Sequence, residues 1–180
     1  GFTLGLGWTS NHDLDCGVIL FDAETKQVEE IVDYSHLRSE RYRIVHTGDV
    51  LNGDNGTPAG EDQEQVHVNL ESFGPNPPIV IFYMTIYTHG PDFRAVRDGF
   101  TKLSDHRTGE EKCCFPLDVK EYGANRAVVL AKVHKTEAGW NFVPIGEALP
   151  GEHMTGRNLV PQIQSRFLGS YKNKNCIYGR

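Results

Sequence analysis

Short apolar or alternating segments, separated by turn residues, recur along most of the chain. This pattern is typical of antiparallel sheets, whereas strands that alternate with long helical segments would indicate a parallel sheet. Two segments, Val18 to Phe21 and Ile79 to Tyr87, are apolar on both faces, which predicts central strands. We expect strands near residues 2–8, 14–21, 27–33, 65–70, 79–87, 110–117, 126–134 and 140–145. The sequence therefore predicts an all-β fold, an antiparallel β-sandwich.

The segment 90–100 breaks the strand pattern. Phe93, Val96 and Phe100 are spaced as on one face of a helix, which predicts a short amphipathic helix that crosses one end of the sandwich.

A second helix is predicted near the C-terminus, with Asn158 as its N-cap, Pro161 in its first turn and Gly169 at its end. Its apolar stripe consists of Leu159, Ile163 and Phe167. A helix with one apolar stripe must pack on something, and we expect that partner to be the sandwich itself. Packing on a second protein is the alternative.

Length and composition favour one globular domain, since 180 residues with 38% hydrophobic content can bury a substantial core. We expect a β-sandwich domain over residues 1–156 and a C-terminal helix with a basic tail over residues 157–180. The chain opens without Met, inside an expected strand, so we expect that it is truncated at its N-terminal side. No apolar run approaches the roughly 20 residues of a membrane helix. Four cysteines without paired spacing indicate reduced thiols in a cytoplasmic protein.

Charge is distributed unevenly. The net charge of −6 argues against a general nucleic-acid or anionic-membrane binder, because such partners require a basic face. Residues 157–180 nevertheless carry +5 without any Asp or Glu, which leaves −11 on the rest of the chain. This tail is either a solvated segment or a docking segment for an acidic protein partner. Its candidate partner-binding residues are Arg157, Arg166, Lys172 and Lys174.

The segment 46–64, "HTGDVLNGDNGTPAGEDQE", contains five carboxylates, three side-chain amides and four glycines. Calcium prefers six to eight oxygen ligands in a flexible geometry, and this segment offers such oxygens. It is not an EF-hand, because no starting position places Glu at position twelve. Composition alone leaves both a solvated acidic loop and a cation site open.

A second acidic group lies at the start of an expected strand, in the sequence Asp13-Leu14-Asp15. Alternation places both carboxylates on one face, about 7 Å apart, and directs Leu14 and Cys16 to the other face. Two such charges repel by roughly 2–3 kcal/mol at an effective dielectric constant of about 20.

Several short motifs follow one another in an order that resembles the TerD-like tellurite-resistance and stress-protein family, from about Leu4 to Gly146. These motifs are "GLGW" (5–8), "DLD" (13–15), "HTGD" (46–49), an acidic run before an alternating strand, "TIY" (85–87) and "GWNFVPIGE" (139–147). The resemblance implies a β-sandwich that binds calcium through acidic loops at one end and has no established catalytic activity. By that similarity the expected calcium ligands are Asp13, Asp15, Asp49, Asp62 and Glu64. Asn52 and Asp54 are added on their oxygen chemistry.

The chain departs from the family pattern near the expected ligands. Gly60 and Gln63 stand where the family often has Asp, and Thr88 stands where an acid often follows "TIY". These changes remove charge, so one of two family-like sites is expected to be weak or lost.

Two alternatives to a non-enzymatic calcium-binding module remain. The first is a scaffold component of a larger assembly that keeps the fold with a partly degenerate calcium site. The second is an enzyme with Cys16, Cys113 or Cys114 as nucleophile, for which no catalytic motif context is present. We therefore expect no catalytic residues, and we expect His46 to fix the acidic loop by hydrogen bonding.

Overall fold

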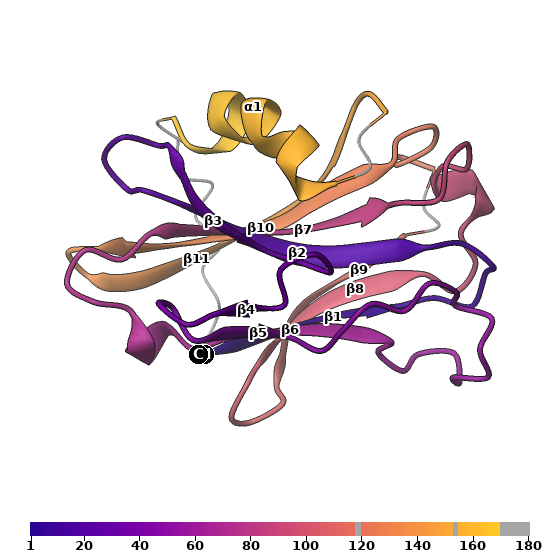
Figure 1. Cartoon of the computed structure of the whole chain (residues 1–180), viewed down its shortest axis with the longest axis horizontal. Helices are drawn as coiled ribbons and strands as arrows, with labels where there is room; N and C mark the ends of the chain where they lie inside the picture. The colour runs from indigo at the N-terminus through magenta and orange to yellow at the C-terminus, as the bar shows by residue number, and fades with distance from the viewer. Residues whose placement is uncertain (118–119, 153–154, 170–180) are drawn as a thin grey trace.

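A computed structural model describes residues 1–117, 120–152 and 155–169. Two antiparallel sheets face each other (Figure 1). The six-stranded sheet has the spatial order β4 (Arg38–Ser39), β5 (Ile44–His46), β6 (Glu64–Val68), β1 (Phe2–Gly7), β8 (Phe100–Asp105) and β9 (Glu111–Pro116). The five-stranded sheet has the order β11 (Gly139–Leu149), β10 (Ala127–Thr136), β7 (Ile79–Ile86), β2 (Leu14–Phe21) and β3 (Val28–Val32). The predicted antiparallel β-sandwich is confirmed.

Side-chain alternation builds the core between the sheets. Leu4 and Leu6 of β1 face Leu14 and Cys16 of β2 within one buried cluster. In β7 all eight residues are buried, and the same holds for β2. Both strands are covered on two faces, as their continuous apolar sequences predict.

Helix α1 (Gly156–Phe167) provides the second cover, and it lies on the outer face of the five-stranded sheet (Figure 1). The predicted stripe of Leu159, Ile163 and Phe167 is buried there, in a cluster that includes Ile19 and Tyr83. The amine of Lys132 donates to the carbonyl of Phe167, 3.0 Å away, and so satisfies a backbone acceptor at the end of the helix. The sandwich is thus the packing partner of the stripe, as expected.

The predicted start of this helix is wrong. Thr155 is the N-cap residue, and Asn158 lies in the first turn, where its backbone N–H donates to the carbonyl of Thr155. Pro161 consequently lies inside the helix rather than in its first turn.

The predicted helix over 90–100 is also wrong. Only Phe93–Ala95 form a 3₁₀ helix, η2, whose first turn is capped by the Asp92 side chain. Asp98 then adopts a φ of 49°, and Phe100 begins strand β8, which the sequence did not predict. The short strands β4 and β5 were not predicted either, and a second 3₁₀ helix, η1 (Leu70–Ser72), follows β6.

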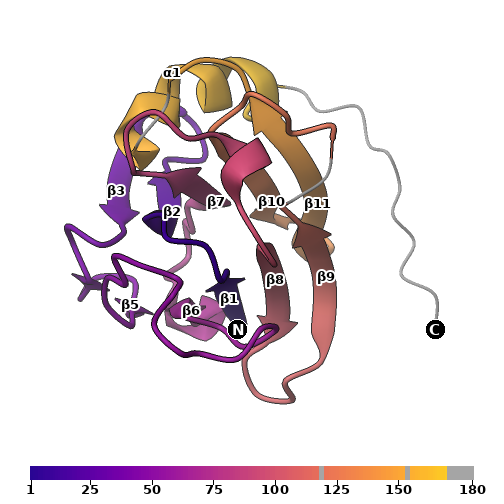
Figure 2. The same ribbon diagram turned by 90° about the vertical axis from the view of Figure 1, so that its right-hand side faces the viewer.

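Four strands place their ends together at one end of the sandwich. Leu14 at the start of β2 pairs with Ile86 at the end of β7, and Leu6 near the end of β1 pairs with Glu64 at the start of β6. The loops that leave these strands therefore gather at the right-hand end in Figure 1, which faces the viewer in Figure 2.

No helix within the described part of the chain has the length and apolar character needed to cross a bilayer.

We predict that Ile163→Ala lowers the free energy of unfolding by about 2–5 kcal/mol, because a fully buried side chain in the helix–sheet interface leaves a cavity. Ser165→Ala, at an exposed position of the same helix, should change it by less than about 0.5 kcal/mol. Urea denaturation of both variants measures the difference. Equal stabilities of the two variants would contradict the role of α1 as a cover of the sheet.

Candidate metal centre

Three of the predicted ligands meet at this end of the sandwich. Asp13 and Asp15 flank the first residue of β2, and Asp49 lies in the loop after β5. Each offers a carboxylate oxygen, and these oxygens lie within 4.8 Å of one another. Residues that are 34 positions apart in the sequence are therefore brought together by the fold.

Burial makes this cluster electrostatically costly. Burial, and then the charge of Asp49, raise the pKa of Asp13 to about 6. Asp15 is only 3% exposed, and burial followed by repulsion from Glu64, Asp13 and Asp49 raises its pKa to about 9. Both carboxylates thus resist ionisation unless a positive charge is added.

Two oxygen atoms of the cluster are buried without compensation. Oδ1 of Asp13 and Oδ2 of Asp15 have no hydrogen-bond partner among the described residues. An unsatisfied buried polar atom of this kind costs about 1–3 kcal/mol. A hard cation fits this donor set, since it accepts carboxylate oxygens as ligands and offsets their repulsion.

The backbone of Asp13 is fixed by the segment after β7. The Asp13 N–H donates to Oγ1 of Thr88 at 2.6 Å, and the Asp13 carbonyl accepts from the N–H of Tyr87 at 2.8 Å. Thr88, which replaces a common family acid, thus holds a predicted ligand in place.

Glu64 connects the acidic loop to strand β2. Its Oε1 accepts from the backbone N–H of Val50 at 2.8 Å, and its Oε2 accepts from that of Cys16 at 3.2 Å. The side chain is fully buried, and this burial is the main reason that its pKa rises to about 8. Its charge contributes to raising the pKa of Asp15, so it lies near the cluster without being one of the three grouped carboxylates.

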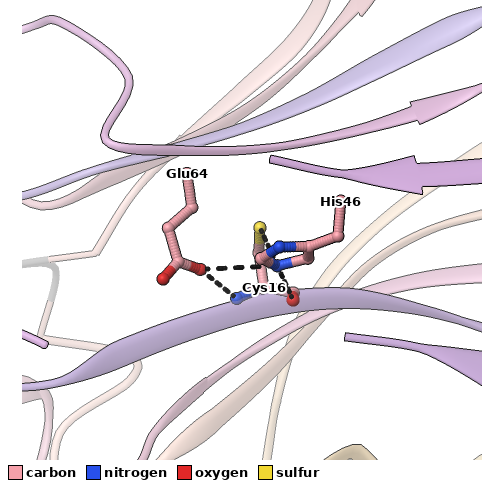
Figure 3. Close-up of side chains that lie close together, drawn as sticks. All are labelled: Cys16, His46 and Glu64. Atoms are coloured by element: carbon pink, nitrogen blue, oxygen red, sulfur yellow. Dashed lines mark hydrogen bonds and ion pairs between the residues drawn. The ribbon is translucent and has the colours of Figure 1, made fainter. Parts of the chain in front are cut away.

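His46 and Cys16 complete a buried network with Glu64. Figure 3 shows the side chains of Glu64 and His46 pointing from one sheet toward Cys16 on β2. Nε2 of His46 lies 3.1 Å from the carbonyl oxygen of Cys16 and 3.7 Å from Oε2 of Glu64. Nδ1 accepts from the N–H of Gly48 at 3.0 Å, which assigns the remaining proton of the neutral ring to Nε2.

This network fixes the loop that carries Asp49. Gly48 has a φ of +120°, a conformation that favours glycine, and its N–H is held by the imidazole just described. Burial lowers the pKa of His46 and raises that of the Cys16 thiol, so both groups are neutral at pH 7. Cys16, His46 and Glu64 also have ligand atoms within 4.8 Å of one another, but both ring nitrogens of His46 already have backbone partners. The expectation that His46 fixes the loop by hydrogen bonding agrees with this geometry.

The structure does not bring Asp62 to the cluster. Strand β6 begins only at Glu64, and Asp62 lies on the outer face of the six-stranded sheet, over Gly5, which has no side chain. Its Oδ1 is 3.0 Å from the amine of Lys102, and its Oδ2 accepts from Nε2 of Gln65 at 2.9 Å. The placement expected for Asp62 is therefore corrected.

The remaining loop oxygens serve the loop itself. Oδ1 of Asn52 accepts from the backbone N–H of Asp54 at 2.7 Å and closes a turn, while the side chain of Asp54 is exposed and lies outside the grouped carboxylates. Gln63 donates from Nε2 to the carbonyls of Trp8 and Gly53. An amide at this position thus cross-links the loop to Trp8, which an acid could not do as a donor.

The predicted partner-binding residues have different surroundings. Arg157 is exposed beside a cavity of about 470 Å³ that is also lined by Asp33, His36 and Thr155. Arg166 forms an ion pair with Glu147 of β11. Lys172 and Lys174 lie outside the described residues.

Comparison with known proteins identifies the family. The sequence profile of the TerD domain matches residues 1–156. The chain is 28% identical to the tellurium resistance protein TerZ of Serratia marcescens, over 81% of this chain and 70% of that protein. It is 26% identical to the stress response protein SCP2 of Bacillus subtilis (strain 168), over 90% of this chain and 78% of that protein.

The fold is shared with solved structures. The crystal structure of a homologue of the telluride resistance protein TerD from Streptomyces coelicolor A3(2) superposes with a TM-score of 0.76, at 15% identity, over 91% of this chain and 96% of that chain. A crystal structure of a protein of unknown function gives a TM-score of 0.74 over 88% and 93% of the two chains. The resemblance found in the sequence motifs is thus confirmed, and the chain belongs to the TerD domain family of tellurite-resistance and stress-response proteins.

Proposed function

We propose that this chain is a non-enzymatic calcium-binding module of the TerD type that acts in a stress response. The observation that carries this proposal is the carboxylate of Asp15, which is almost fully buried, unpartnered at Oδ2, and grouped with Asp13 and Asp49. Asp13, Asp15 and Asp49 would hold the ion. When bound, calcium would supply the positive charge that offsets their mutual repulsion and would tie the loop after β5 to the start of β2.

The choice of calcium rests on the donor atoms. All three grouped residues offer carboxylate oxygens, which hard cations prefer, and loop positions such as Asp49 allow the flexible geometry that calcium accepts. Zinc would favour the nitrogen and sulfur donors of the neighbouring Cys16 and His46, but that thiol is buried with a raised pKa.

A non-enzymatic role is supported by the state of the thiols. Burial raises the pKa of Cys113 to about 11, raises that of Cys114, and raises that of Cys16 well above its usual range. Since the thiolate is the nucleophile, these cysteines are poorly suited to covalent catalysis at neutral pH.

A scaffold role with a degenerate calcium site is the second candidate. It is favoured by the pairing of Asp62 with Lys102 and by the turn that uses Asn52, because both leave few loop oxygens for a second ion. The exposed Arg157 would be available for an acidic protein partner. Stability that is indifferent to calcium would favour this candidate over the first.

The first prediction is that calcium raises the midpoint of thermal unfolding in a concentration-dependent way. A ligand that binds only the folded state stabilises it by about 2.7 kcal/mol at a concentration of 100 times Kd. Scanning calorimetry in calcium and in chelator measures the shift. Asp15→Asn should abolish it, whereas Asp54→Asn, an exposed acid of the same loop, should retain it; an unchanged shift in Asp15→Asn would refute the assigned site.

The second prediction concerns stability without the ion. In chelator at pH 7, Asp15→Asn should raise the free energy of unfolding by about 1 kcal/mol or more, since each unit of pKa shift corresponds to about 1.4 kcal/mol. The physical reason is that the substitution removes a buried acid that is repelled by Glu64, Asp13 and Asp49. Denaturant unfolding in chelator tests this, and a loss of stability would show that the acid is not a source of strain.

The third prediction separates the structure from the ligand set that the sequence implied. Asp62→Asn should leave the calcium affinity within about a factor of two, because this residue pairs with Lys102 on the outer face of the sheet. Titration calorimetry compares the variant with the parent protein. A tenfold weakening, which corresponds to about 1.4 kcal/mol, would restore Asp62 as a ligand.

A further inference from the structure

A cavity of about 370 Å³ lies beside the carboxylate cluster but outside it. It is lined by His89 and Asp92 from the segment after β7, by Ala124 and Arg126 before β10, and by Glu152 after β11. This volume is within the usual range of small-molecule sites, which is about 300–1,000 Å³. The cavity opens at the same end of the sandwich as the loops that carry Asp13 and Asp49, the end that faces the viewer in Figure 2.

Arg126 gives this cavity its chemical character. The residue is only 5% exposed, and its guanidinium donates through one terminal nitrogen to the carbonyls of Ile86 and Thr88. Its Nε is buried and has no hydrogen-bond partner among the described residues. No carboxylate of the described part of the chain lies within the 4.0 Å of an ion pair with it.

Such an arrangement is unusual for a charged group. Arginine stays protonated in proteins, and buried charges are normally paired with an opposite charge. Asp92 is near enough for Arg126 to contribute to the lowering of its pKa, but both of its oxygens are bound by the guanidinium of Arg94, at 2.5 and 2.9 Å. The positive charge of Arg126 is thus held at the cavity by two carbonyl dipoles and lacks a direct anionic partner.

We propose that this cavity is a binding site for a small carboxylate, with the guanidinium of Arg126 as its main contact. The planar guanidinium offers parallel N–H groups whose geometry matches a carboxylate. The acidic side chains of Asp92 and Glu152 on the walls of the cavity disfavour a doubly charged anion and so favour a single negative charge. The site is separate from the proposed calcium site, and its existence does not depend on calcium binding.

Ala124 provides a test that leaves the buried arginine in place. This residue is exposed and lines the same cavity, so a longer side chain there should not disturb the core. Ala124→Glu places a competing carboxylate at the cavity, whereas Ala124→Gln adds nearly the same volume without the charge. The pair therefore separates loss of the anion site from simple steric filling.

The experiment is an NMR titration of the full chain, in chelator and at constant ionic strength, with sodium acetate, inorganic phosphate and sodium chloride as separate probes. We expect acetate at millimolar concentration to shift the Arg126 Nε–H signal and the amide signals of residues 89–90 and 151–152 in a saturable way. Ala124→Glu should weaken the apparent Kd for acetate at least tenfold, and Ala124→Gln should change it less than threefold. Unchanged amide signals of β7 and β10 in both variants serve as the control for folding.

Three results would overturn the proposal. The first is a shift that does not saturate or that chloride reproduces, which would indicate a general salt effect. The second is equal weakening by Ala124→Glu and Ala124→Gln, which would indicate steric filling alone. The third is tighter binding of phosphate than of acetate, which would contradict the selection of a single charge by Asp92 and Glu152.

Discussion

The architecture of this protein depends on how like charges are held together at one end of a β-sandwich. Asp13, Asp15 and Asp49 bring carboxylate oxygens within 4.8 Å of one another, although burial and mutual repulsion oppose their ionisation. The apolar interior of the sandwich supplies the free energy that tolerates such a cluster. Strands β2 and β7 are buried along their full length, between the core on one side and helix α1 on the other. The acidic end is thus an exception that the rest of the fold can stabilise.

The position of the acids is set by backbone hydrogen bonds rather than by the acids themselves. Thr88 holds the backbone N–H of Asp13, and Glu64 bridges the N–H groups of Cys16 and Val50. His46 fixes Gly48, one residue before Asp49. These contacts place two distant segments of the chain against each other before any ligand is considered, which is the preorganisation that a selective site requires. They also explain why neutral residues such as Thr88 can occupy positions where relatives carry acids.

The fold was largely predictable because burial on two faces leaves a continuous apolar sequence. The run from Ile79 to Tyr87 predicted β7, and the stripe of Leu159, Ile163 and Phe167 predicted both α1 and its contact with the sheet. Strand β8 was missed because its buried residues, Thr101 and Leu103, alternate with polar ones and follow a segment with helical spacing. The short strands β4 and β5 depend on pairing with β6, a tertiary effect that local sequence does not encode.

The site was predictable only in part, for a related reason. The DLD motif and the HTGD motif indicated Asp13, Asp15 and Asp49, which the fold brings together. The different environment of Asp62 depends on Gly5 and Lys102, which are distant in sequence, so proximity to Glu64 along the chain was misleading. Arg126 was not singled out at all, because its importance lies in the absence of a carboxylate partner among the described residues. A pairing of that kind becomes visible only in three dimensions.

Calorimetric titration of the metal-free protein with calcium tests the central claim most directly, because it reports both the number of ions and the heat that the grouped carboxylates produce. The account predicts saturable binding of one ion per chain in the parent protein and no measurable heat of binding in Asp15→Asn. Absence of binding to the folded parent protein, or undiminished binding to Asp15→Asn, would show that the cluster of Asp13, Asp15 and Asp49 is not held together for a cation.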